Sequence, residues 1–282
     1  MDNAGVYAGA NPLQKRDATE TVKEFFHKMR WGSRETVLDV GCGPGDVTAK
    51  VLFPKLPVDA SCVGVDLSDR MVHHASTNHG HPRLSFFQFD ISTKDTHHLD
   101  RVLQLYPATK VVSFYCLHWV LDQSGAVKNI YRLLAPGGET LLVLLARSPV
   151  FELYEKMAVI PEWSEYMRDS DRFISPYQHV VDPRAVFHDL LTAEGLEVLH
   201  CSCREQTFDF SSLDSLRESV KAVNPFLDRI PEDLREKFID ECMATAAGLC
   251  DVDKERHTVR TRYSLLVAHA RKPWQKNGQF SP

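Results

Sequence analysis

The residues with the clearest capacity for chemistry lie in a glycine-rich segment, residues 37–48, which reads VLDVGCGPGDVT. Gly41 and Gly43 begin a GxGxG pattern after an apolar run, and glycine lets a backbone turn sharply and approach a ligand closely. A dinucleotide-binding loop needs glycine at position 46, where this sequence has Asp46. Asp39, just before the first glycine, would repel a pyrophosphate but stabilise an ammonium or sulfonium group. The segment therefore favours a cationic ligand and argues against a nicotinamide oxidoreductase.

Two further acids end later apolar runs. Asp66 lies 25 positions after Gly41, where a carboxylate can accept hydrogen bonds from both ribose hydroxyls. Asp90 ends a third run, within reach of an adenine amino group, and Met71 and Ile91 could pack on the two faces of that ring. Each acid alone could equally cap a strand end or a helix, but three at successive strand ends favour a nucleoside site. The predicted cofactor-binding residues are Asp39, Gly41, Cys42, Gly43, Asp66, Leu67, Met71, Asp90, Ile91 and Ser113.

A histidine and a tryptophan stand side by side in residues 114–119, FYCLHW. Trp119 follows a predicted strand and is expected to point into a site beside the glycine loop. The alternative is a core tryptophan whose indole N–H donates to a backbone carbonyl. His118 could contact a ligand, and a packed neutral histidine is an equally open alternative.

A parallel sheet is required to bring these residues together. The predicted strands of the first half are apolar on both faces and separated by helices, which is typical of a parallel sheet covered on both sides. Such an α/β fold is doubly wound and binds ligands above the carboxyl ends of its strands. The predicted strands are residues 36–40, 62–66, 84–89, 110–115 and 139–146, and the predicted helices are residues 46–52, 69–77 and 123–134.

The second half of the chain has longer helical patterns and fewer strands. We expect a single domain over residues 1–282, in which residues 35–146 bind the cofactor and residues 1–30 and 147–250 contribute the substrate pocket. The predicted helices here are residues 152–167, 184–194, 212–223 and 231–249, and the predicted strands are residues 196–203 and 258–271, the latter being the last strand.

Composition excludes several classes of protein. The formal net charge is −5 and the pI about 6.2, without a basic stripe that would indicate a nucleic-acid partner. No apolar run approaches the roughly 20 residues of a membrane span, and the first residues do not resemble a signal peptide, so a cytoplasmic protein is expected. The seven scattered cysteines are expected to be reduced thiols, and no histidine or cysteine spacing predicts a metal site.

Three of these motifs resemble a known superfamily. LDVGCGPG, VGVDLS and FDI, within residues 35–146, are similar to the first three motifs of the class I S-adenosylmethionine-dependent methyltransferases. The resemblance implies S-adenosyl-L-methionine as cofactor. It also implies a Rossmann-like fold with a seven-stranded, mostly parallel sheet, helices on both faces and a helical substrate-binding cap.

A narrower resemblance extends over nearly the whole chain. The segments NPLQKRDA, FYCLHWV, DRFISPY and AVNPF closely resemble the arthropod juvenile hormone acid O-methyltransferases, which methylate the carboxylate of farnesoic acid or its epoxide. The resemblance implies that Gln14 and Trp119 hold the substrate carboxylate and act as the catalytic pair.

The chemistry agrees with that assignment. A carboxylic acid with a pKa near 4 is ionised at pH 7, so the reaction needs no general base. A glutamine amide and an indole N–H are neutral donors that can orient the anion, whereas a bidentate arginine would withdraw charge from the attacking oxygen. The hydrophobic tail requires an apolar cleft. The predicted substrate-binding residues are Gln14, Tyr115, His118, Trp119, Phe151, Trp163, Phe173, Ile174, Tyr177 and Phe226.

Two alternatives stay open at this point. The acceptor could be another small carboxylic acid, or an oxygen or nitrogen nucleophile, with the same cofactor. The chain could also be a non-catalytic carrier or sensor of a lipophilic acid. Whether the preferred acid carries an epoxide, its stereochemistry, and the oligomeric state, including a homodimer, are also open.

Overall fold

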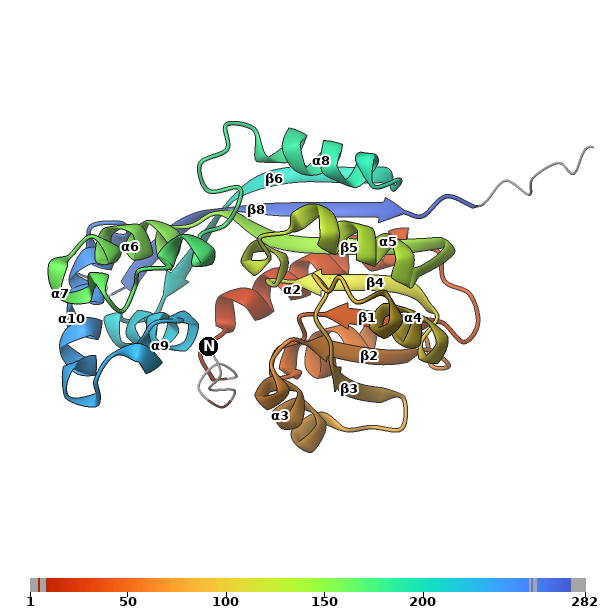
Figure 1. Cartoon of the computed structure of the whole chain (residues 1–282), viewed down its shortest axis with the longest axis horizontal. Helices are drawn as coiled ribbons and strands as arrows, with labels where there is room; N and C mark the ends of the chain where they lie inside the picture. The colour runs from red at the N-terminus through yellow and green to blue at the C-terminus, as the bar shows by residue number, and fades with distance from the viewer. Residues whose placement is uncertain (1–4, 6–8, 254, 256–257, 275–282) are drawn as a thin grey trace, which may run out of the picture.

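The computed structural model describes residues 5, 9–253, 255 and 258–274. Its centre is an eight-stranded sheet in the order β3-β2-β1-β4-β5-β8-β6, with β7 paired to β8 outside that path (Figure 1). The first five strands are parallel, and β8 is antiparallel to both β5 and β6. The strands are β1 (Thr36–Val40), β2 (Ser61–Asp66), β3 (Leu84–Gln88), β4 (Ala108–Phe114), β5 (Leu134–Arg147), β6 (Glu197–Phe210), β7 (Asp251–Asp253) and β8 (Thr258–Arg271).

The doubly wound α/β prediction is confirmed, and the strand count needs one correction. The expected seven strands are present, and β7 is an eighth, pairing Val252 with Val259 of β8. A strand of three residues is too short for an alternating pattern to predict it. β6 also continues to Phe210, beyond the predicted end at residue 203, because it pairs with β8 along almost its whole length.

Helices cover both faces of the sheet. On one face, α4 (Thr96–Leu105), α5 (Gln123–Leu133) and α8 (Pro183–Ala193) bury apolar residues such as Leu99 and Ile130. On the other face lie α2 (Pro12–Phe25) and the short π-helix Thr48–Leu52, whose Leu52 is fully buried. α3 (Asp69–His79) packs beside β2 and β3, and the hydroxyl of Ser68 caps it by accepting from the N–H of Met71. Neither α2 nor α4 was predicted as a helix.

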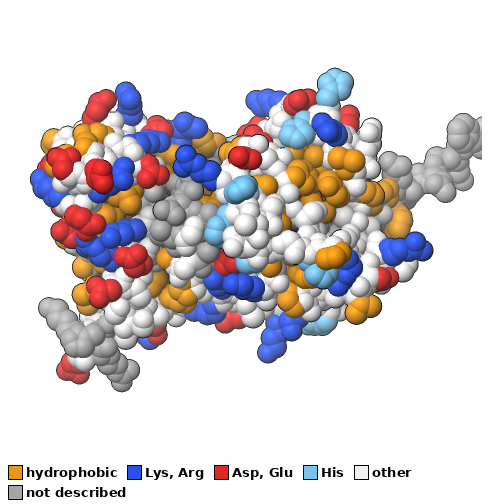
Figure 2. Space-filling view, turned by 90° about the horizontal axis from the view of Figure 1, so that it is seen from below, with side chains coloured by type: hydrophobic (Ala, Val, Ile, Leu, Met, Phe, Trp, Pro, Cys, Tyr) orange, Lys and Arg blue, Asp and Glu red, His pale blue; other side chains and the backbone are white. Residues whose placement is uncertain are grey.

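A helical cap extends from one end of the sheet, at the left of Figure 1. It consists of α6 (Pro149–Ala158), α7 (Pro161–Ser164), α9 (Leu213–Val223) and α10 (Arg235–Ala247), which share their own hydrophobic cluster. The expected helix over residues 152–167 is split, because Pro161 has no N–H to donate to the preceding turn. Figure 2 shows acidic and basic side chains intermixed over the cap, as in the ion pair between Lys237 and Glu162.

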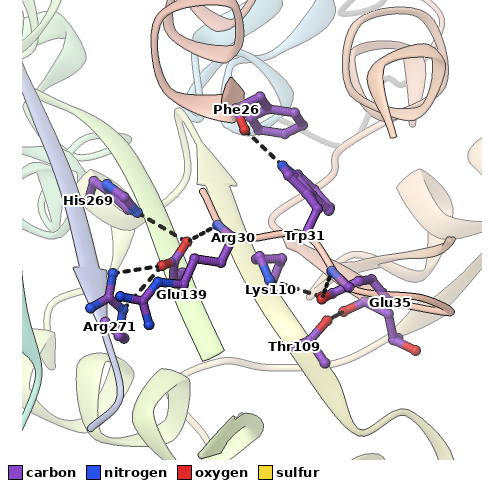
Figure 3. Close-up of polar contacts among 11 residues, drawn as sticks. Phe26, Arg30, Trp31, Glu35, Thr109, Lys110, Glu139, His269 and Arg271 are labelled. Carbon is purple, nitrogen blue, oxygen red and sulfur yellow. Dashed lines mark hydrogen bonds and ion pairs between the residues drawn. The ribbon is translucent and has the colours of Figure 1, made fainter. Parts of the chain in front are cut away.

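Polar contacts anchor the segment between α2 and β1 to side chains of β5 and β8 (Figure 3). The backbone N–H of Arg30 donates to Oε2 of Glu139 at 3.0 Å, and the Arg271 guanidinium donates to Oε1 of the same side chain. Burial raises the pKa of Glu139, but hydrogen bonds from His269, Arg30 and Arg271 outweigh it and lower the pKa to about 2. Nearby, the ammonium of Lys110 contacts Glu35. These contacts hold the carboxyl-terminal end of α2 in place and leave its first turns to face the site.

Candidate active site

The glycine loop after β1 has the geometry of a close approach. The N–H groups of Gly41 and Cys42 donate to the carbonyl of Val65 at 2.7 and 3.0 Å. Gly41 has φ of 75°, and a Cβ there would lie 2.2 Å from Cβ and Sγ of Cys116, so only glycine fits. Gly43 has φ of 55°, and a Cβ there would meet nothing within 4 Å. The loop is thus closed against β2 and β4 on one side and open to a ligand on the other.

Two of the predicted acids lie at this loop. Asp39 is buried at the end of β1 and accepts from the hydroxyl of Thr48 at 2.6 Å. Its burial raises the pKa to about 7, the Thr48 hydroxyl opposes the rise, and the neighbouring Asp66 adds to it. Asp66 accepts from the N–H of Gly43 at 2.9 Å and from that of Ser68 at 2.9 Å. A cationic ligand beside Asp39 would relieve the cost of burying the charge of this carboxylate. The two carboxylates of Asp39 and Asp66 therefore fit a sulfonium.

The third acid is placed differently. Oδ1 of Asp90 accepts from the N–H and the hydroxyl of Ser92 at 2.8 and 2.7 Å. These bonds form a local turn after the strand, which is the alternative role given above for an acid at a strand end. Met71 and Ile91 are buried, and Leu67 is exposed at 66%. These four predicted cofactor residues are not among those that line a cavity at the loop, so their contact with a nucleoside stays a prediction.

A small cavity, here called the loop cavity, opens above the carboxyl ends of β1 and β4. Four predicted cofactor residues line it, whereas Ser113 lies beneath and donates to the carbonyl of Val40 at 2.9 Å. Its lining residues are Asn11, Gln14, Asp39, Gly41, Cys42, Gly43, Pro44, Asp46, Val47, Phe114 and Tyr115.

A second cavity, here called the apolar cavity, lies between the sheet and the cap. Gln14 and Tyr115 line both cavities, so the two spaces meet at these side chains. Among the described residues, no lysine, arginine, aspartate or glutamate lines the apolar cavity. Those residues are Leu13, Gln14, Tyr115, His118, Trp119, Leu145, Ser148, Pro149, Val150, Leu153, Phe210, Leu216, Ser219, Val220, Val223, Ala246, Cys250, Thr261 and Tyr263.

The histidine and tryptophan of the FYCLHW segment both reach this cavity. Nδ1 of His118 accepts from the N–H of Leu145 at 3.3 Å, so the ring proton is on Nε2, and burial lowers its pKa to about 3. The ring of Trp119 packs 4.6 Å from that of His118 and 5.7 Å from that of Phe151. Among the described residues, no acceptor binds the indole N–H of Trp119, unlike that of Trp31, which donates to a backbone carbonyl. Trp119 therefore presents a free donor in a half-buried position.

Gln14 and Tyr115 are held at the junction by the first turns of α2. Oε1 of Gln14 is buried and has no hydrogen-bond partner among the described residues. One turn later, Oδ2 of Asp17 accepts from the hydroxyls of both Tyr115 and Tyr263, at 2.5 and 2.6 Å. Tyr115 also has φ of 58°, a left-handed conformation that non-glycine residues adopt rarely and mainly at functional sites. Both tyrosine hydroxyls are thus occupied, and the unpartnered amide of Gln14 is left for a ligand.

The six residues expected to line the tail pocket are not among the residues that line either cavity. Phe151 is fully buried behind Trp119, and Trp163 donates from its indole to Glu241 within the cap. Tyr177 donates to Gln123, in the core under α5 and α8. Large aromatic side chains are more often core than lining, and these fill the spaces between cap helices and sheet. None of the six lines either cavity: Phe151, Trp163, Phe173, Ile174, Tyr177 and Phe226.

The lining residues that sequence reasoning missed come from several elements, among them α6, α9, α10 and β8. Leu216, Val220 and Val223 lie on α9 at helical spacing, and Ala246 and Tyr263 face them from α10 and β8. The apolar period of α9 was the available signal, but it predicts only that one face is buried and does not say against what.

Two classes of site were also searched for in the described part of the chain. No group of three or more histidine, cysteine, aspartate or glutamate residues there could hold a metal ion. No helix within the same residues combines the length and apolarity that a membrane crossing requires.

Comparison with known proteins agrees with this geometry. Residues 13–201 match the family model described as "Methyltransferase domain". The juvenile hormone acid O-methyltransferase of Drosophila melanogaster is 36% identical over 96% of this chain and 93% of its own length. The protein of the same name from Bombyx mori is 34% identical over 96% of this chain and 98% of its own. A crystal structure of a putative methyltransferase from Bacillus halodurans C-125 shares the fold, with a TM-score of 0.53 and 20% identity over 89% of this chain and 98% of its own. The chain therefore belongs to the methyltransferase domain family and, within it, to the juvenile hormone acid O-methyltransferases.

Proposed function

We propose that the enzyme methylates the carboxylate of a lipophilic sesquiterpenoid acid, a juvenile hormone acid or farnesoic acid, and releases the methyl ester in juvenile hormone biosynthesis. One observation carries the proposal: Gln14 and Tyr115 line both the loop cavity and the apolar cavity. A methyl donor at the glycine loop and an acid whose tail fills the apolar cavity would therefore meet at the amide of Gln14.

The loop cavity suits the cofactor of this family. S-adenosylmethionine supplies an activated methyl group on a sulfonium. Asp39, Gly41, Gly43 and Asp66 would hold it, because the two glycines leave main chain accessible and the two carboxylates favour a cation and ribose hydroxyls. Binding a cation beside Asp39 would stabilise the ionised form of that buried carboxyl.

The side chains of the apolar cavity bind and orient the acid and do not remove a proton. The substrate carboxyl is already ionised near pH 7, so no base is required. His118 is suited to donation, because burial lowers its pKa to about 3 and its Nδ1 is occupied by Leu145, which leaves Nε2–H for the cavity. Both Gln14 and Trp119 line the cavity, and the Nε2 amide group of Gln14 and the indole N–H of Trp119 would be two further neutral donors.

Neutral donors fit the charge change of the reaction. A hydrogen bond to an ionised acceptor contributes roughly 1.5–3 kcal/mol, enough to aim one carboxylate oxygen without neutralising it. Attack on a cationic donor joins opposite charges and annihilates them, so a cavity whose described lining residues include no lysine, arginine, aspartate or glutamate favours the step. Positioning the two reacting atoms about 3 Å apart is then the main contribution of the protein.

The proposal extends to the organisation of the chain. Residues 1–282 would act as one domain, with residues 35–146 holding the cofactor and the flanking segments closing the acid pocket. The enzyme is proposed to be cytoplasmic and to act on small molecules. On the face that Figure 2 shows, acidic and basic side chains are intermixed, which supports the proposal that this face does not bind nucleic acid.

The test is transfer of a labelled methyl group from S-adenosylmethionine to a panel of acids, with the methyl ester as readout. The panel contains farnesoic acid, its epoxide, linear fatty acids of graded length and one small hydrophilic acid. Preference for the sesquiterpenoid acids is expected, because the cavity is apolar and closed by the cap. Binding of these acids without ester formation would indicate a carrier, and equal rates over the whole panel would contradict a fitted tail cavity.

A further inference from the structure

Asp46, the residue that excludes a dinucleotide-binding loop, makes contacts that its position in the motif does not require. It is 2% exposed, at the end of the glycine loop. Its Oδ1 and Oδ2 accept from Nδ2 of Asn11 at 3.3 and 3.2 Å. Its Oδ2 also lies 2.7 Å from the ammonium of Lys15. The loop is thus tied by one carboxylate to the beginning of α2.

The two partners of Asp46 flank Gln14. Asn11 occupies the N-cap position of α2, yet its side chain makes no capping hydrogen bond and is directed to Asp46 instead. An asparagine at this position normally accepts from the first turn, at a stabilisation of about 1 kcal/mol, so the helix forgoes its cap in favour of the contact with the loop. Lys15 immediately follows Gln14. The first turn of α2 is therefore anchored on both sides of the amide that faces the two cavities.

A second anchor holds the next turn independently. Asp17 accepts from Tyr115 and Tyr263, and Arg16 donates to the carbonyl of Thr207 at 2.6 Å. These contacts fasten α2 to β6, β8 and the segment after β4 one turn beyond Gln14, whereas Asp46 contacts the residues Asn11 and Lys15 on either side of it. The placement of Gln14 relative to the loop cavity then depends on Asp46.

We propose that Asp46 is a positioning residue which, through Lys15 and Asn11, sets Gln14 between the two cavities, so that the loop holding the cofactor also aims the amide that orients the acid. The inference rests on the proposed function. Asp46 acts through Gln14 and needs no contact with the acid. Loosening it would move the amide relative to the methyl donor while leaving the apolar cavity intact.

The cleanest perturbation is Lys15→Met, because Lys15 is a third exposed and is not among the residues that line either cavity. Its matched control is Lys23→Met, which removes the same charge from an exposed position on the same helix. The ion pair between Lys15 and Asp46 is partly exposed to solvent, so we expect its loss in Lys15→Met to raise KM for the acid about threefold. Loss of the charge-assisted contacts in Asp46→Asn predicts about a tenfold fall in kcat/KM.

A merely structural role would lower stability without changing these kinetic constants per folded molecule. We therefore expect Lys15→Met to keep the calorimetric Kd for S-adenosylmethionine within about twofold of wild type while KM for the acid rises. The double variant Lys15→Met, Asp46→Asn is expected to be no worse than Asp46→Asn alone, because both act on one contact. Amide hydrogen exchange over residues 12–18 should accelerate in Asp46→Asn, and exchange in α5 should not.

Equal acid KM values for Lys15→Met, Lys23→Met and wild type would overturn the inference, as would additive effects in the double variant. If Asp46→Asn does not fold, the comparison of the two lysine variants still decides. A wild-type enzyme that forms no ester would instead refute the proposed function, so the two failures are distinguishable.

Discussion

Trp119→Phe isolates one hydrogen-bond donor from the rest of the site. The indole N–H of Trp119 has no acceptor among the described residues and faces the apolar cavity. Phenylalanine keeps an aromatic ring against His118 and Phe151, whose centroids lie 4.6 and 5.7 Å from that of the indole. The substitution therefore removes the donor while preserving most of the apolar packing.

The magnitude follows from the charge of the acceptor. A hydrogen bond to an ionised group is worth about 1.5–3 kcal/mol, and each 1.4 kcal/mol is a factor of ten, so kcat/KM for the acid should fall about 10- to 150-fold. Trp119 does not line the loop cavity, so the affinity for S-adenosylmethionine should stay within about twofold of wild type. Trp119→Ala should cut turnover at least as much, because it also leaves a void beside Phe151.

The assay is labelled-methyl transfer to farnesoic acid at varied acid concentration, with cofactor affinity measured separately by calorimetry. Trp31→Phe is the matched control, since its indole N–H donates to the carbonyl of Phe26 at 2.8 Å, remote from either cavity. It should lower stability and leave kcat/KM unchanged. If Trp119→Phe turned over like this control, with normal cofactor binding, the indole would not hold the carboxylate and the assignment would be refuted.

Three further predictions test the remaining groups. Gln14→Ala should cut turnover by more than about tenfold with near-normal cofactor affinity, and Gln14→Glu should do worse, because a second anion would repel the substrate; equal rates for wild type and both variants would contradict this. Burial raises the pKa of Asp39 to about 7, so the ligand-free fold loses the contribution of this group as pH rises from about 4 through 7. The cofactor should bind about tenfold tighter at pH 8 than at pH 6, where few Asp39 carboxyls are ionised, and Asp39→Asn should abolish the pH dependence in calorimetry. Gly43→Ala should weaken cofactor binding and lower Tm modestly, because a positive φ strains alanine, whereas Gly41→Ala should lower Tm much more because its Cβ would also lie 2.2 Å from Cys116; equal melting temperatures would count against this geometry.

The sequence by itself determined the frame of the site. Short apolar runs that carry an acid at or beside their last residue predicted β1 and β2 and located Asp39 and Asp66 near the strand ends. Parallel strands align their carboxyl ends, so local patterns of this kind predict which residues gather at one edge of a sheet. The loop glycines were predictable from local sequence as well. Their spacing after a strand indicates where the backbone turns and where it can approach a ligand closely.

Only the tertiary structure decided which side chains line the acid cavity. Phe151 and Trp163 have the chemistry of a tail pocket, but they are buried behind its wall, and Val220 and Tyr263 line it instead. A cavity is formed by elements far apart in the chain, and burial looks the same in sequence whether a side chain meets another helix or an open space. The junction at Gln14 depends likewise on contacts between α2 and the glycine loop across more than 30 residues of chain. Such contacts leave no local period, because they are determined by how rigid elements pack and not by the propensity of any one of them.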